Sequence, residues 1–124
     1  MAFKIRMGVP EMEALWTDLS TRKQRAQLDK DEERFFRRFV KALGYLAANP
    51  RHNSLASHEI EELSRQHGFK IFQSYLENRT SAAGRIFWAY GPDRGDLTVL
   101  AVEPHPEDEK RGVYKRIKLA SLPP

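Results

Sequence analysis

The sequence predicts an α+β fold, in which an N-terminal strand and a helical hairpin pack on an antiparallel β-meander. Two observations lead to this expectation. Apolar residues recur at helical spacing between about residues 10 and 50, and strand-like stretches rich in aromatic and β-branched residues follow between residues 70 and 103. Because turn residues separate these stretches, consecutive strands are expected to pair as neighbours.

The first half of the chain is expected to contain one strand and two helices. Residues 3–7 alternate apolar and basic side chains, which is typical of a half-buried strand. A first helix is expected from about residue 10 to residue 19 or further, since Pro10 is tolerated in a first turn and apolar residues recur on one face. Asp29 and Glu32 have the spacing of a capping box and precede a continuous apolar stripe. A second helix should therefore start there and end at Pro50.

The second half is expected to contain a loop followed by the meander. Residues 51–68 are polar, so we expect a loop with at most a short helical turn, and strands are expected at residues 70–76, 85–90 and 97–103. Residues 114–119 fit either a strand or a helical turn. The helical hairpin should cover one face of the sheet and leave the other face open, where a ligand would bind.

Length and composition limit the possible functions. The 124 residues fit a single domain spanning residues 1–124, and the absence of cysteine excludes thiol nucleophiles, disulfides and Cys-based zinc sites. No uncharged apolar run approaches the roughly 20 residues that cross a bilayer, and the first residues lack the apolar core of a signal peptide. We therefore expect no membrane partner and a cytoplasmic location.

The formal net charge of +4 favours a polyanionic partner. The densest group of basic residues lies near the C-terminal end of the chain. It consists of Lys110, Arg111, Lys115, Arg116 and Lys118. A charge run of this kind fits either a solvated surface or a patch that contacts phosphate, and the sequence leaves both open.

His105 is the best placed of the four histidines for proton transfer. It lies between two prolines just after the last expected strand, and Glu103 should point to the same side of that strand. A neighbouring carboxylate fixes the tautomer of an imidazole, which suits a general acid or base. The alternative is a histidine that only caps carbonyl groups at the end of a strand.

Two further histidines, His52 and His58, lie six residues apart in the expected loop. No metal site is expected there, because a third ligand is missing and the spacing does not match known ligand sets. One of the two is expected to line the open face of the sheet, and the other to lie on the surface or serve a structural role.

Arg85 opens the central strand of the meander, and Tyr75 and Asn78 lie at the end of the preceding strand. Antiparallel pairing can bring these side chains together. An arginine beside a tyrosine and histidines is able to cradle a phosphate and stabilise additional negative charge on it. The alternative is an exposed ion pair between Arg85 and Glu77, which would contribute little.

The layout resembles the toxins of the RelE/ParE superfamily, and is closest to its histidine-containing YafQ-like and HigB-like branches. The resemblance rests on the order of strand, helical hairpin and meander, and on the Leu-x2-Asn-Pro-Arg-His run at residues 46–52. It also rests on the Arg-Ile-Phe-Trp start of the central strand at Arg85 and on the histidine after the last strand. It covers residues 35–105.

This resemblance implies a bacterial toxin that enters the ribosomal A site, cleaves mRNA there and is held inactive by a cognate antitoxin. It implies that Arg85 contacts phosphate, that His105 is an acid or base, and that His58 is the loop histidine. Tyr75 stands where a second catalytic histidine is found. No cofactor is needed, because the 2′-hydroxyl of RNA is the nucleophile.

From these assignments we expect His105 and His58 to share proton transfer, Arg85 and Arg51 to stabilise the phosphate, and Tyr75 to position it. Further substrate-binding residues are expected at His52, Asn78, Glu103, Lys115 and Arg116. Two other functions stay open. One is a gyrase inhibitor of the same superfamily, for which His105 would be dispensable. The other is a noncatalytic RNA- or protein-binding module whose open face is only an interface.

Overall fold

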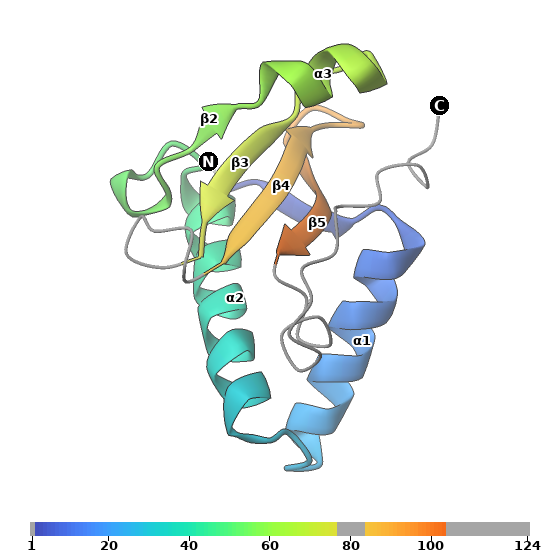
Figure 1. Cartoon of the computed structure of the whole chain (residues 1–124), viewed down its shortest axis with the longest axis vertical. Coiled ribbons are helices and arrows are strands. Elements are labelled where there is room, and N and C mark those ends of the chain that lie inside the picture. The colour runs from blue at the N-terminus through green and yellow to red at the C-terminus, as the bar shows by residue number, and fades with distance from the viewer. Residues whose placement is uncertain (1, 77–83, 104–124) are drawn as a thin grey trace.

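The computed structural model describes residues 2–76 and 84–103. Its elements are β1 (Lys4–Met7), α1 (Pro10–Gln24), α2 (Lys30–Ala48), the 3-10 turn η1 (Asn53–Leu55), β2 (His58–Glu59), α3 (Glu61–His67), β3 (Phe72–Tyr75), β4 (Arg85–Tyr90) and β5 (Asp96–Glu103). The strands form one sheet in the spatial order β1-β5-β4-β3-β2. Figure 1 shows this sheet above the V formed by α1 and α2, and the predicted α+β class is confirmed.

The sheet is mixed. The strands β3, β4 and β5 pair antiparallel, as expected of a meander, whereas β1 joins the outer edge of β5 in parallel. A parallel neighbour needs a long crossover, which the helices and the first part of the meander supply. The register of β4 against β5 shifts between Phe87 and Trp88, where Leu100 is the extra residue of a β-bulge.

The helical hairpin follows directly from local sequence signals. The Asp29 carboxylate accepts from the backbone N–H of Glu32 at 2.8 Å, and the Glu32 carboxylate accepts from the backbone N–H of Asp29 at 3.1 Å. This is the predicted capping box. Phe39 and Leu46 on the inner face of α2 are fully buried, so apolar contact with the sheet fixes the orientation of the helix.

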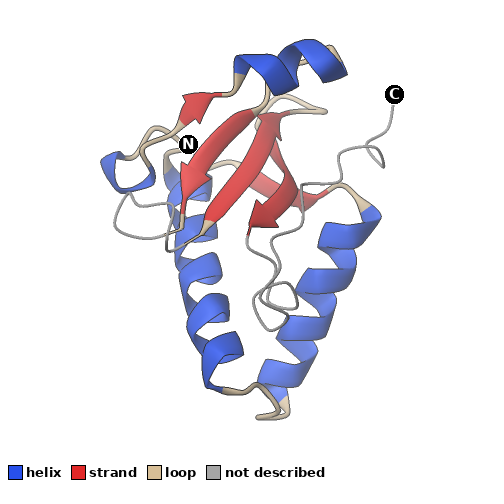
Figure 2. Cartoon of the chain, in the orientation of Figure 1, coloured by secondary structure: helices blue, strands red, loops and turns tan. Residues whose placement is uncertain are grey.

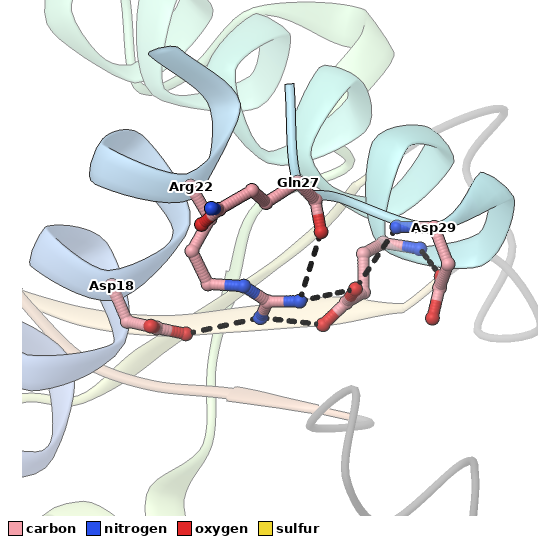
Figure 3. A network of polar contacts seen from close by, with 5 residues as sticks. Asp18, Arg22, Gln27 and Asp29 are labelled. Atoms are coloured by element: carbon pink, nitrogen blue, oxygen red, sulfur yellow. Dashed lines mark hydrogen bonds and ion pairs between the residues drawn. The ribbon is translucent and has the colours of Figure 1, made fainter. Parts of the chain in front are cut away.

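A salt-bridge network joins the two helices near their connection (Figure 3). The guanidinium of Arg22 donates to both carboxylate oxygens of Glu32 at 2.8 Å, to Asp18 at 3.3 Å and to the carbonyl of Gln27 at 3.3 Å. Hydrogen bonds to Glu32, and then to Asp18, raise the pKa of Arg22 above its ordinary value. Glu32 is buried, and Arg22 compensates its negative charge. The same carboxylate also accepts from the backbone N–H of Asp29 at the start of α2.

The segment between the hairpin and the meander is more regular than expected. The structure forms β2 and the seven-residue helix α3 there, so the expectation of a loop with at most a short helical turn is wrong. Hydrogen bonds to Ile71 account for the difference. The backbone N–H of Ile60 donates to the carbonyl of Ile71 at 2.8 Å, and the N–H of Ile71 donates to the Ser64 hydroxyl at 2.8 Å. Gly68, with a φ of +78°, then ends α3 in the left-handed conformation.

The helical hairpin covers one face of the sheet, and α2 passes behind β3 and β4 in the view of Figure 1; Figure 2 shows the same layering by element type. Trp88 and Val99 on this covered face are fully buried. On the opposite face, Phe87 and Ala89 are 4% and 5% exposed. The expectation of an open face is therefore wrong for the centre of the sheet. The exposed polar side chains of that face lie at its two sides, with His58 on β2 and with Lys4 and Arg6 on β1.

None of the helices in the described ranges combines the length and apolar character of a membrane-spanning segment. The tail, for which strand and helical turn were both expected, lies outside the described residues.

Candidate functional site

Three of the predicted site residues lie on neighbouring strands of the sheet. The β3–β4 register pairs Tyr75 with Arg85, and the β2–β3 register pairs His58 with Gln73. Because side chains alternate along a strand and paired residues share a face, all four project from the face turned away from the helical hairpin. We refer to His58, Gln73, Tyr75 and Arg85 as the sheet-face cluster.

Ring and guanidinium contacts link the members of this cluster. The centroids of the His58 and Tyr75 rings are 6.5 Å apart, with an interplanar angle of 46°. Arg85 donates from Nη1 to Oε1 of Gln73 at 3.3 Å, and its guanidinium carbon lies 5.7 Å from the ring centroid of Phe87. The cation is thus held at the sheet surface by a neutral amide and an aromatic face.

The hydrogen bond of His58 determines what its imidazole can do. Nδ1 lies 3.2 Å from the carbonyl oxygen of Ala56. A carbonyl oxygen only accepts, so in this contact Nδ1 carries the proton of the neutral ring. Nε2 then keeps its lone pair, and the exposed ring of His58 presents a base to solvent.

A chain of hydrogen bonds fastens the segment before β2 to the sheet. The indole N–H of Trp88 donates to the Ser74 hydroxyl at 2.8 Å, the hydroxyls of Ser74 and Ser57 are 2.6 Å apart, and the Ser57 hydroxyl donates to the carbonyl of Pro50 at 2.6 Å. Since Ser57 gives its one proton to Pro50, Ser74 must be the donor to Ser57. We call this the serine relay. It anchors the residue next to His58 and thereby positions the start of β2.

Arg51 and His52 do not join the sheet-face cluster. The Arg51 guanidinium lies 5.6 Å from the ring centroid of Phe72, whose side chain belongs to the opposite face of β3. The His52 ring stacks on Tyr45 at 4.3 Å, and its Nδ1 accepts from the backbone N–H of Ser54 at 3.0 Å. In this structure, His52 caps η1 and Arg51 covers an aromatic ring.

Of the remaining predicted site residues, only Glu103 lies within residues 2–76 and 84–103. The backbone of Glu103 pairs with that of Arg85, which places this position beside the cluster. His105, Asn78, Lys115 and Arg116 lie outside the described residues, as does Glu77, the alternative partner of Arg85. The role of His105 as the second proton-transfer group stays a prediction.

Sequence reasoning missed Gln73 and the serine relay. Gln73 is 5% exposed and uncharged, yet its side-chain oxygen accepts a hydrogen bond from Arg85 and so helps to position the guanidinium. Its position two residues before Tyr75 was a usable signal, because residues two apart in a strand share a face. The relay carried no such signal, since Ser57 and Ser74 meet only through the tertiary fold.

Within residues 2–76 and 84–103, no group of three or more histidine, aspartate or glutamate side chains is arranged to hold a metal ion. Comparisons of the chain with protein-family models, with curated proteins and with solved structures each find no match. Function therefore has to be inferred from the sheet-face cluster and from the distribution of charge on the molecule.

Proposed function

We propose that the protein is a metal-independent endoribonuclease that cleaves mRNA and inhibits translation, as toxins of RelE/ParE type do. The observation that carries this proposal is the placement of His58, Tyr75 and Arg85 on three adjacent strands of one sheet face. A base, a hydroxyl donor and a fixed cation within one cluster are the groups that RNA cleavage by internal transesterification requires.

The proposed reaction begins at the 2′-hydroxyl of the substrate. Nε2 of His58 takes the proton of this hydroxyl, and the oxygen attacks the adjacent phosphorus. The guanidinium of Arg85 stabilises the negative charge of the phosphorane, while the Tyr75 hydroxyl donates a hydrogen bond to a nonbridging oxygen. The bond to the 5′ oxygen then breaks, and His105 is proposed to supply the proton to that leaving group. The products are a 2′,3′-cyclic phosphate and a 5′-hydroxyl.

We also propose the biological setting from the resemblance described above. The substrate is mRNA on the ribosome, the inhibitor is a cognate antitoxin protein, and both meet the protein in the cytoplasm. The net charge of +4 supports a polyanionic substrate.

The proposal is tested by measuring mRNA cleavage in a translating extract and mapping the ends produced. His58→Ala should slow cleavage by about 100-fold or more, as expected for loss of a general base. Arg85→Ala should slow it by a similar factor, because a charge-stabilising donor is removed. His67→Ala and Arg65→Ala on α3 are matched controls that should cleave at the wild-type rate.

Two results would contradict the proposal. One is a folded His58→Ala protein that cleaves as fast as the wild type. The other is a wild-type protein that produces no new RNA ends while it inhibits DNA gyrase, which would favour the gyrase-inhibitor alternative. A 2′,3′-cyclic phosphate on one new end and a 5′-hydroxyl on the other are the expected chemical signatures.

A further inference from the structure

A row of four exposed cations runs along the outer side of α2. They are Lys30, Arg34, Arg37 and Lys41, which we call the basic stripe. At about 100° per residue, these positions fall within about 60° of one another around the helix axis. The buried residues of α2 lie on the other side of the helix, so the stripe faces away from the core and from the sheet.

The charge of the basic stripe is largely uncompensated. Arg34 lies 3.6 Å from Asp31, but both side chains are more than half exposed, and such a pair contributes little. Glu33, the acidic neighbour of the stripe, is already paired with Lys23 at 2.9 Å. In the part of the chain that the structure describes, Lys30, Arg37 and Lys41 form no ion pair. The stripe therefore presents a surplus of positive charge to solvent.

The surface is also hollowed beside the stripe. An open depression of about 430 Å³ is lined by Leu28, Lys30, Glu33, Arg34 and Arg37. Three of these five side chains are cations, and the space that they border is large enough for a phosphate group with its sugar. A guanidinium pair and an ammonium around one hollow match the oxygens of a phosphodiester.

We propose that the basic stripe binds the phosphate backbone of a double-helical RNA segment, separate from the strand that is cut. The stripe is about 16 Å long, which is enough to contact several consecutive phosphates. It consists of cations without an interleaved aromatic side chain, which suits backbone contact rather than base stacking. Because the stripe and the sheet-face cluster face opposite ways, one short strand does not reach both. The protein would thus lie between two RNA segments.

The choice of RNA rests on the proposed function, but the test does not require cleavage. Binding of the full chain to a fluorescently labelled RNA duplex of 20 base pairs is measured by anisotropy over a range of salt concentrations. Lys30, Arg34, Arg37 and Lys41 are changed together to Gln. The matched control changes Lys4, Arg65, Lys70 and Arg94 to Gln, which are also exposed and lie outside α2. Both variants lose four charges and fall from +4 to a formal net charge of 0.

The stripe variant should bind the duplex at least about tenfold more weakly, and its salt slope should fall by about 3 to 4 units, as loss of four phosphate contacts predicts. The control variant should keep most of the affinity and slope. Equal losses in both variants would overturn the proposal, because net charge alone would then explain binding. Competition by polyglutamate as strong as competition by unlabelled duplex would also overturn it, in favour of an acidic protein partner.

Failure of this inference and failure of the proposed function are distinguishable. His58→Ala should bind the duplex like the wild type although it cleaves mRNA about 100-fold more slowly or worse. The stripe variant should retain a folded core, checked by circular dichroism, so that its weaker binding is not a result of unfolding.

Discussion

The serine relay makes a sharp prediction for the change Ser74→Ala. This substitution removes the acceptor of the Trp88 indole N–H and the donor to Ser57. Ser74 and Trp88 are both fully buried, so water does not replace the lost partner. A buried unsatisfied donor costs about 1 to 3 kcal/mol, and the lost hydroxyl–hydroxyl bond adds about 1 kcal/mol. We expect the free energy of unfolding to fall by about 2 to 4 kcal/mol.

Urea unfolding followed by circular dichroism measures this effect, and Tm should fall by about 4 °C per kcal/mol in a domain of this size. Ser20→Ala is the matched control. The Ser20 hydroxyl is buried without a hydrogen-bond partner among the described residues, so its removal should be neutral or stabilising. Both changes delete one hydroxyl from a serine, and only the loss at Ser74 leaves a donor without its acceptor.

A double-mutant cycle with Trp88→Phe tests the cause. Phenylalanine removes the indole donor, so Ser74→Ala should cost about 1 to 2 kcal/mol less in that background than in the wild type. The reasoning would be refuted if Ser74→Ala were as mild as Ser20→Ala. It would also be refuted if the two changes were additive within about 0.3 kcal/mol, since independent sites add in this way.

Four further predictions concern the scaffold. Gly8→Ala should lower the free energy of unfolding by about 1 to 3 kcal/mol, because its Cβ would lie 2.5 Å from Cγ2 of Thr98. Thr98→Ser deletes that methyl group and should restore part of the loss, as measured by thermal unfolding. Asp29→Ala should cost about 1 kcal/mol in urea unfolding through loss of the helix cap, and Asp29→Asn much less. Arg22→Met should destabilise more than Arg34→Met, since it leaves the buried Glu32 unpaired, and equal losses would contradict this. The hydrogen bond to Glu32 raises the pKa of Arg22. The charged guanidinium therefore contributes its full stabilisation at every pH below the ordinary arginine pKa, and this stabilisation is lost only as the pH rises through the raised pKa. Deprotonation of Arg22 should thus not change Tm between pH 7 and pH 10.

The helical hairpin was predictable because its signals are local. The capping box at Asp29 and Glu32, the apolar period of α2 and the stop at Pro50 all act within a few residues of one another. The central strand was predicted with its observed bounds, since turn residues isolate it. By contrast, α3 has no fully buried residue, so its sequence carries little apolar periodicity to detect.

The candidate site was predictable only in part, for the same reason. Tyr75 and Arg85 face each other because consecutive antiparallel strands pair by default, and that rule was available from sequence. The placement of Arg51 and His52 depends on the direction in which the chain leaves α2. That direction is set by long-range contacts, such as the cover of Phe72 by Arg51 and the stacking of His52 on Tyr45, which no local pattern encodes.

The parallel pairing of β1 with β5 has a consequence for folding. Ile5 lies opposite Leu97, so the two partners are separated by 92 positions in the chain. Contacts of such high sequence separation form late, because a large loop must close before they contribute. During synthesis, the helical hairpin is complete long before β5 exists, while β1 has no partner strand. The nascent chain therefore completes its sheet, and with it the framework that supports the sheet-face cluster, only after nearly all of the described residues have been made.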